Sequence, residues 1–397
     1  MKKKPADRDW SWLTANTLLL ALASLFGDVS TEMLYPILPT FLVSLGASGS
    51  IIGIIEGLAQ ATQNIVQGLS GYLSDRLQQP KRIAMAGFLF AALAKPLIGL
   101  SVVWPAVFAT RLLDRIGAGA RSAPRDALIA ASVADEHRGK AFGLEGVGDN
   151  LGAFIGPVIT VALLGLAGLQ LRWIFYLAVV PGLLAFLMVV LVRPPRTIAV
   201  PAKMRLDTNL RAFPATYWRY LAVTALFCLG NSSSAFLILE TQDVGISLDA
   251  TILIYAGFNL VAALTSYPAG FLSDRFGRKT ILATGFTALL VVYLGFASSR
   301  SILVVAAMFG LYGCFQGVFR VVGKSFAADL VPQELRASGI GWYGAIVGLT
   351  QLVASIVAGL LWDRAGHQAV FAYGAVFALL GMLALVGLVP GNAKRPR

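Results

Sequence analysis

Long apolar runs separated by short polar connections dominate the sequence from residue 13 to residue 389. A membrane-spanning helix needs about 20 mostly apolar residues, and we count twelve runs of sufficient length. They cover residues 13–45, 51–74, 83–103, 105–130, 139–166, 171–192, 218–243, 250–273, 280–298, 301–328, 337–361 and 367–389. Pro36 and Pro39 are expected to kink or end the first helix. Because lipid offers the backbone no hydrogen-bonding partner, the sequence predicts an all-α membrane protein with twelve transmembrane helices.

Composition supports a membrane location and argues against nucleic acid as a partner. Hydrophobic residues make up 57% of the chain and charged residues 13%, whereas soluble domains carry about 25% charged residues. The net charge of +12 would suit a nucleic-acid-binding protein, but the basic residues cluster where apolar runs end. Cys228 and Cys314 lie inside apolar runs, where we expect packing residues rather than a disulfide or a metal pair. Membrane lipid is therefore the expected surrounding.

Lysine and arginine are distributed unequally between the two sides of the predicted helix array. Most of them occupy the chain ends and the connections that follow the even-numbered runs, whereas the other side holds Arg172, Arg300 and Arg364. Cytoplasmic loops of membrane proteins carry the excess of positive charge. Both termini are therefore predicted to be cytoplasmic, in a multi-pass protein of the inner membrane.

One six-residue segment occurs twice, at a separation of half the chain length. Residues 71–76 (GYLSDR) recur as residues 270–275 (GFLSDR), 199 positions later. At the same offset, Arg121 and Arg125 correspond to Arg320 and Lys324. A repeat of this size indicates internal duplication. We predict two six-helix bundles, residues 1–192 and 218–397, joined by a polar cytoplasmic linker at residues 193–217.

The repeated segment also carries a family resemblance. Residues 270–279 (GFLSDRFGRK) resemble the loop motif between the second and third helices of each half in the major facilitator superfamily. In the first copy, residues 77–80 (LQQP) replace the short glycine turn. The resemblance covers nearly the whole chain and implies a secondary transporter whose two pseudo-symmetric bundles surround a central cavity. No P-loop is present, so we expect an ion gradient as energy source, no cofactor and no enzymatic activity.

Ionised residues inside apolar runs are candidates for function, because a charge in the membrane costs about 2.5–3.5 kcal/mol. Asp28 and Glu32 lie four residues apart on one helix face, where their repulsion favours the binding of a proton by one of them. The fourth run adds Arg111, Asp114 and Arg115, at positions where the second half has glycine or cysteine. We expect these five residues to couple proton and substrate movement; structural ion pairing is the alternative.

Polar residues at helical spacing inside other runs are candidates for the cavity lining. The expected lining residues are Glu56, Gln60, Asn64 and Asp149 in the first half and Asn231, Asn259 and Gln316 in the second. In lipid, such a stripe should face an interior path rather than hydrocarbon. Helix packing is the alternative role, and the sequence leaves both open.

Charged residues shared by the two halves are better explained by a gate than by substrate contacts. The expected cytoplasmic gate comprises Asp75, Arg76, Arg121, Arg125, Asp274, Arg275, Arg320 and Lys324. We expect ion pairs among these residues to close the cytoplasmic side, with contacts within one half or across both. The Arg115-x-x-x-Gly119 segment resembles the fourth-helix arginine motif of the superfamily, which implies a link between Arg115 and proton coupling.

Two further resemblances concern the direction and the substrate of transport. Residues 35–39 (YPILP) resemble the first-helix motif of drug–proton antiporters, and residues 152–157 resemble the fifth-helix signature of superfamily exporters. They imply proton-coupled efflux of a small toxic solute or drug by a monomer. Residues 27–33 and 111–126 resemble nickel-resistance exporters, so metal efflux stays open, although two histidines offer no evident metal site. Siderophore or metabolite traffic in either direction is the remaining transport alternative.

Overall fold

The computed structural model describes residues 13–134, 137–193, 213–332 and 335–390, and all regular secondary structure in these residues is helical. The first half contains α1 (Ala15–Glu32), α2 (Leu38–Ser44), α3 (Gly49–Leu77), α4 (Pro80–Leu100), α5 (Trp104–Ala131), α6 (Arg138–Val161), η2 (Ala162–Leu166), α7 (Leu171–Leu177) and α8 (Val179–Leu191). The second half contains α9 (Ala215–Cys228), α10 (Ala235–Asp243), α11 (Leu248–Phe276), α12 (Arg278–Ser298), α13 (Ile302–Val318), η4 (Phe319–Gly323), α14 (Lys324–Asp329), α15 (Arg336–Ala365) and α16 (His367–Leu388).

Each of the twelve predicted runs coincides with one helix or with consecutive helical segments. The first run breaks between α1 and α2 beside Pro36, as expected of a residue that cannot donate a helical hydrogen bond. The seventh run, predicted as continuous, breaks as well, because α9 ends at Cys228 and α10 begins at Ala235. By length and composition alone, eight of the described helical elements could each cross a membrane. The other four runs comprise the two broken helices and the polar α3 and α5.

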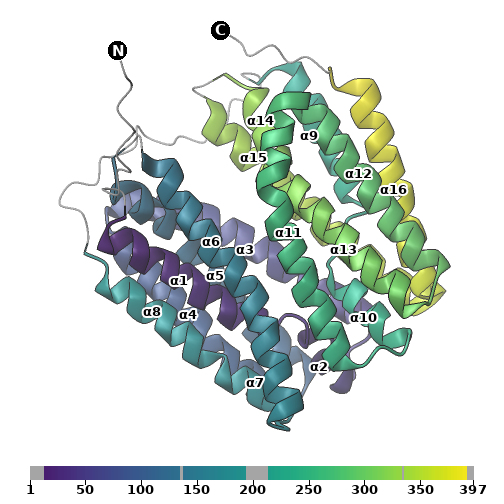
Figure 1. Ribbon diagram of the computed structural model, residues 1–397, viewed down its shortest axis with the longest axis horizontal. Helices are drawn as coiled ribbons and strands as arrows, with labels where there is room; N and C mark the ends of the chain where they lie inside the picture. Colours follow the sequence, from purple (N-terminus) through teal and green to yellow (C-terminus); the bar gives the residue numbers. More distant parts are fainter. Residues whose placement is uncertain (1–12, 135–136, 194–212, 333–334, 391–397) are drawn as a thin grey trace, which may run out of the picture.

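The helices form two bundles that meet at one end of the molecule (Figure 1). Within the first bundle α4 packs on α5 and α1 on α6; within the second, α11 packs on α13 and α12 on α16. The bundles touch through α3 with α15 and through α6 with α11. We call the end at which α1 begins and α16 ends the terminal end, and the end with α2, α7 and α10 the distal end (Figure 1). Most of the linker predicted at 193–217 lies outside the described residues, so the domain boundaries stay a prediction.

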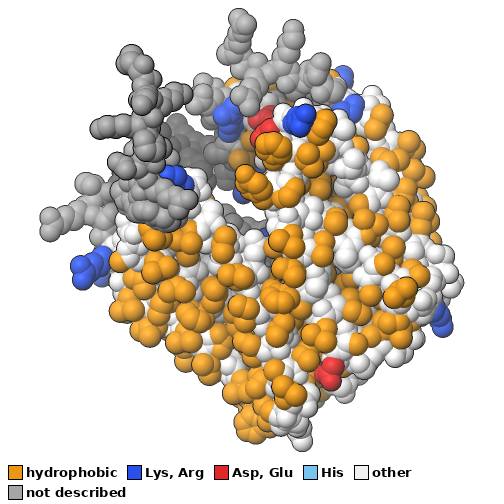
Figure 2. Space-filling view, viewed as in Figure 1, with side chains coloured by type: hydrophobic (Ala, Val, Ile, Leu, Met, Phe, Trp, Pro, Cys, Tyr) orange, Lys and Arg blue, Asp and Glu red, His pale blue; other side chains and the backbone are white. Residues whose placement is uncertain are grey.

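The two ends of the molecule differ in how closely the bundles approach. At the distal end one hydrophobic cluster contains Phe41 and Ile52 of the first bundle and Phe236, Leu239 and Ala358 of the second. At the terminal end, Figure 2 shows a hollow between the bundles. Among the described residues, the two bundles therefore meet at the distal end and stand apart at the terminal end.

Polar contacts between the bundles reinforce the distal closure. Asp363, near the end of α15, accepts hydrogen bonds from the backbone N–H groups of Gly49 and Ser50, both 2.8 Å long, in the first turn of α3. The Ser50 hydroxyl donates to the same carboxylate at 2.5 Å. The Gln242 side-chain amide of α10 donates to the Thr40 hydroxyl of α2. A single carboxylate thus holds the first turn of α3 against the second bundle.

Glycine permits a close contact between α4 and α5 in the first bundle. A Cβ atom at Gly117 of α5 would lie 2.5 Å from the Ala91 backbone nitrogen of α4. A Cβ atom at Gly87 of α4 would lie 2.5 Å from the Arg121 nitrogen of α5. Since such distances are too short for real side chains, α4 and α5 approach this closely only with glycine at both positions. The contact holds the charged face of α5 against Lys95 of α4.

Candidate functional site

Five buried ionisable side chains from α3, α4 and α5 form one network, which we call the basic cluster: Glu56, Lys95, Arg111, Asp114 and Arg115. Arg111 binds Glu56 with two parallel hydrogen bonds, Nε to Oε1 at 3.1 Å and Nη2 to Oε2 at 3.2 Å. Asp114 Oδ2 accepts from Arg111 Nη1 at 3.2 Å and from Arg115 Nη2 at 2.6 Å. Three predicted coupling residues and one predicted lining residue therefore lie in direct contact.

Lys95 completes the basic cluster from the facing helix. Its ammonium lies 3.4 Å from Asp114 Oδ1 and donates a 3.2 Å hydrogen bond to the Ala91 carbonyl. Arg115 also donates to the side chain of Gln63 at 2.9 Å. Buried charges are stable only when each is paired and hydrogen-bonded. With all five groups ionised, three cations oppose two anions, so the cluster carries one positive charge in excess.

Glu32 does not share the contacts of Asp28. It forms a hydrogen bond that links the two bundles. The hydroxyl of Tyr255, on α11, donates to Glu32 Oε2 at 2.9 Å. The Tyr255 ring stacks on Tyr35 with 5.5 Å between centroids, and the Tyr35 hydroxyl is 2.9 Å from the Ser234 hydroxyl. Arg111, Arg115 and Arg320 are each close enough to interact electrostatically with Glu32. The arginines of the basic cluster thus act on an acid at the bundle boundary.

A second network, richer in carboxylates, joins α1, α5 and α6. Asp28 pairs with Arg121 at 3.4 Å. Arg125 pairs with Asp126 at 3.0 Å, with Glu145 at 2.8 Å and with Asp149 at 3.5 Å. The two arginines, predicted as gate residues, therefore bind acids of their own bundle in this structure.

The remaining predicted lining residues have different surroundings. Gln60 is exposed and donates to Asn64 at 3.1 Å. Asn259 of α11 donates to the Ala153 carbonyl of α6 at 3.1 Å, across the bundle boundary. Gln316 donates to the Tyr312 hydroxyl at 2.8 Å. Asn231, at the break between α9 and α10, is 1% exposed, and its amide has no partner among the described residues.

The predicted gate residues of the second bundle lie at its terminal end. Asp274 pairs with Arg278 at 2.7 Å, within α11 and the start of α12. Arg320 and Lys324 are exposed, as are Arg76 and Arg275, which lie in the last turns of α3 and α11. The side chain of Asp75 lies outside the described part of the structure. A role of these residues in closing the terminal end stays a prediction.

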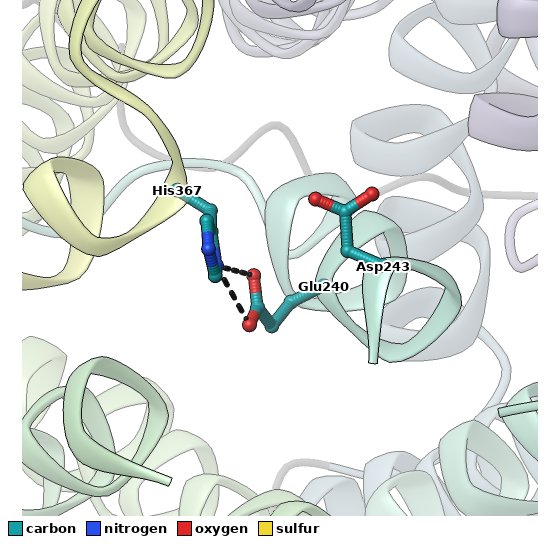
Figure 3. A group of neighbouring side chains, drawn as sticks. All are labelled: Glu240, Asp243 and His367. Carbon is teal, nitrogen blue, oxygen red and sulfur yellow. Dashed lines mark hydrogen bonds and ion pairs between the residues drawn. The ribbon is translucent and has the colours of Figure 1, made fainter. Parts of the chain in front are cut away.

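Three potential metal ligands gather at the distal end (Figure 3): Glu240, Asp243 and His367, with ligand atoms within 4.8 Å of one another. His367 Nδ1 lies 2.7 and 2.9 Å from the two oxygens of the fully buried Glu240. Arg300 Nη2 lies 2.7 Å from His367 Nε2. Since the guanidinium can only donate, Nε2 accepts and Nδ1 carries the hydrogen toward Glu240. Asp243 makes no drawn contact with either partner (Figure 3).

The sequence analysis assigned no role to three residues that make ion pairs or hydrogen bonds in the structure. Lys95 had no assigned role, since a lysine beside Pro96 could equally extend toward the membrane surface. Glu145 precedes Asp149 by one helical turn, and this spacing was the available signal. Asp363 accepts a hydrogen bond from Gly49 of α3, 314 residues away in the sequence. No local sequence pattern predicts such a contact.

Comparison with known proteins identifies the family to which the chain is similar. The family model described as Major Facilitator Superfamily matches residues 20–239 and 220–397. An uncharacterized MFS-type transporter of Methanocaldococcus jannaschii is 32% identical over 391 residues, which cover 97% of each chain. The fosmidomycin resistance protein of Escherichia coli is 23% identical over 398 residues, which cover 95% of this chain and 93% of that protein.

Two solved structures share the fold at low sequence identity. The nucleoside transporter NupG superposes with a TM-score of 0.82 at 15% identity and covers 94% of this chain and 100% of its own. A D-xylose-proton symporter superposes with a TM-score of 0.76 at 18% identity and covers 96% of this chain and 98% of its own. With two family-model matches that together span nearly the whole chain, the protein belongs to the Major Facilitator Superfamily and is a multi-pass secondary transporter.

Proposed function

We propose that this transporter exports a small toxic solute or drug across the cytoplasmic membrane in exchange for protons. The observation that carries the proposal is the 2.9 Å hydrogen bond from the Tyr255 hydroxyl to Glu32, which joins the two bundles. An ionised carboxylate accepts such a bond more strongly than a neutral carboxylic acid. Binding of a proton to Glu32 therefore weakens a contact between bundles, and so couples proton occupancy to their relative position.

Arginines supply the counter-charge for this exchange. Arg115 and Arg111 stay charged at any working pH and favour the ionised form of Glu32 until a proton arrives. Asp28, which is 26% exposed and 3.4 Å from Arg121, is the second acid within reach of protons from the hollow. In the proposal the terminal end faces the cytoplasm, since most connecting Lys and Arg residues lie there. The name of the fosmidomycin resistance protein supports a toxic compound as cargo.

Inverted membrane vesicles test the proposal. With a pH-sensitive dye, addition of fosmidomycin or another member of a panel of toxic compounds should trigger proton movement when the chain is present. Glu32→Gln should abolish the signal, because an amide cannot exchange a proton. Asp249→Asn is the control, since this exposed acid lies in the first turn of α11 and belongs to neither candidate site. Unchanged proton movement in Glu32→Gln would remove Glu32 from the mechanism.

Export of a divalent metal ion is the second candidate. The gathering of Glu240, Asp243 and His367 at the distal end favours it, together with the resemblance to nickel-resistance exporters. The same vesicles decide between the two cargo classes. Proton movement driven by Ni²⁺ or Zn²⁺, with no response to organic compounds, would establish metal export. A response to neither class would direct the search to metabolites, as the name of a 24% identical probable 4-methylmuconolactone transporter suggests.

A further inference from the structure

An open groove of about 610 Å³ runs between α12 and α16 at the terminal end of the second bundle. Figure 1 shows α16 on the side of this bundle that is farther from the first bundle. The groove is lined by Lys279, Thr280, Ala283, Thr284 and Thr287 of α12 and by Val386 of α16. Because both helices are long and apolar enough to cross a membrane, the groove faces lipid close to one membrane surface.

The exposed face of α12 changes from polar to apolar along the helix. Near the terminal end it carries three exposed threonines, Thr280, Thr284 and Thr287, each about one helical turn from the next. Further along, the same face carries Val291 and Leu294, which are 43% and 51% exposed. The threonines cover about 10 Å of the helix axis. They therefore extend from the level of the lipid head groups to the edge of the hydrocarbon core.

The internal duplication shows that the fold does not need these hydroxyl groups. When the first residues of α4 and α12 are aligned, the three threonines correspond to Arg82, Ala86 and Leu89 of the first bundle. The exposed polar stripe therefore belongs to the second bundle and needs an explanation other than helix packing.

A lysine supplies positive charge at the terminal end of the groove. The Lys279 ammonium donates to the Val386 carbonyl at 2.8 Å and to the Val389 carbonyl at 2.6 Å, where α16 ends. Lys81 caps α8 in the same way, through the Val190 carbonyl at 2.7 Å. An ammonium group has three donors, so Lys279 keeps one for a ligand. The first turn of α12 contains no acidic residue, and no described carboxylate pairs with Lys279, so the groove favours an anion.

The hydroxyl groups are suited to a polar ligand that lies in lipid. Thr284 donates to the Ile281 carbonyl at 2.7 Å, and Thr287 donates to the Ala283 carbonyl at 3.0 Å. These bonds satisfy the hydroxyl hydrogens without water and leave polar oxygen atoms at the surface of the groove. The Thr280 hydroxyl makes no hydrogen bond to a described residue, so it is available to a ligand beside Lys279.

We propose that this groove binds an anionic phospholipid from the leaflet at the terminal end. The phosphate accepts hydrogen bonds from the Lys279 ammonium and the Thr280 hydroxyl, because basic pockets between transmembrane helices suit anionic head groups. The glycerol and ester groups lie beside Thr284 and Thr287, and an acyl chain continues along the apolar face at Val291. The binding site depends on neither the cargo nor the direction of transport.

Native mass spectrometry of the full-length chain in detergent tests the proposal with phosphatidylglycerol and, as the neutral lipid, phosphatidylcholine of the same acyl chains. Wild type should bind phosphatidylglycerol more tightly. Lys279→Gln should raise the Kd of the first phosphatidylglycerol about fivefold. Lys81→Gln is the matched control, since it removes the corresponding helix cap of the first bundle and should leave this Kd unchanged.

A second variant replaces the three threonines together by valine, which keeps the shape of the groove and the capping lysine. It should also weaken binding of phosphatidylglycerol, and it decides the matter if Lys279→Gln does not fold. Equal affinity for the two lipids, an equal loss in Lys81→Gln, or wild-type affinity in the valine variant would overturn the inference. In vesicles, a photoreactive phosphatidylglycerol should label peptides of α12 and α16, and labelling confined to other helices would likewise contradict it.

Discussion

Replacement of Asp363 by asparagine is expected to loosen the closed distal end. The carboxylate accepts three hydrogen bonds from the first turn of α3, from Gly49 N and Ser50 N at 2.8 Å and from Ser50 Oγ at 2.5 Å. Its negative charge also lies at the positive end of the α3 helix dipole, a contact that contributes about 0.3–1 kcal/mol. Since α15 and α3 belong to different bundles, this energy favours the closed state over the open one.

The size of the effect follows from the groups that asparagine retains. A hydrogen bond to a charged group contributes about 1.5–3 kcal/mol, and Asp363 is exposed, so solvent reduces this figure. Asparagine keeps one carbonyl acceptor but loses the charge and at least one of the three hydrogen bonds. We expect the closed state to lose about 1–2 kcal/mol, a shift of about 5- to 30-fold in the ratio of closed to open molecules.

Accessibility of a buried cysteine at the distal contact measures this shift. Ala358, which is 0% exposed in the distal hydrophobic cluster, is replaced by cysteine in a background that lacks Cys228 and Cys314. A membrane-impermeant thiol reagent then reacts with the open fraction, and Asp363→Asn should raise the rate about 5- to 30-fold. Asp249→Asn is the control, because it removes a carboxylate from the first turn of the corresponding helix α11. An unchanged rate, or an equal rise in the control, would refute the assigned role.

Three further substitutions test the site and its packing. Tyr255→Phe keeps the stacked ring but removes a hydrogen bond that contributes about 1 kcal/mol. Substrate-driven proton movement in vesicles should therefore fall severalfold, and a wild-type signal would contradict this expectation. Gly117→Ala should cost about 1–3 kcal/mol through overpacking against α4 and lower the Tm in detergent, whereas Gly68→Ala, with no described heavy atom within 4 Å of its Cβ, should not. Glu56→Gln leaves Arg111 without its bidentate partner and should lower the free energy of unfolding by about 3–5 kcal/mol. The expected readout is a lower Tm or loss of folded chain, whereas a wild-type Tm would show that the pair is dispensable.

The helix pattern could be predicted from the sequence because it depends on local properties. Run length identifies a spanning segment, and proline explains the break between α1 and α2. The break between α9 and α10 contains no proline, and its origin is partly tertiary, since a Cβ atom at Gly230 would lie 2.6 Å from Phe377 Cβ of α16. Serines at residues 232–234 were a weak turn signal inside an otherwise apolar run. Such a break depends on a partner helix more than a hundred residues away in the chain.

The pairing of charges could not be predicted, because it depends on how helices rotate against one another. Sequence spacing placed Asp28 and Glu32 on one helix face, yet Asp28 binds Arg121 and Glu32 binds Tyr255 of the other bundle. Similarly, Arg121 and Arg125 recur at the gate positions of the second half, but here they bind acids of α1, α5 and α6. A duplicated position predicts a common place in the fold, whereas the partner of a side chain depends on neighbours that the duplication does not share.

The asymmetry between the bundles supports the proposal that the basic cluster serves transport rather than folding. At the positions that correspond to Arg111, Asp114 and Arg115, the second bundle has glycine, glycine and cysteine. Its core is instead built from aromatic stacks such as Phe227 on Phe286, with 3.5 Å between ring centroids. The same helix arrangement is therefore reached with apolar packing, which is at least as stabilising as a buried ion network of similar volume. Because the fold does not require buried charges at these positions, their presence in one bundle supports the proposal that Arg111, Asp114 and Arg115 serve transport.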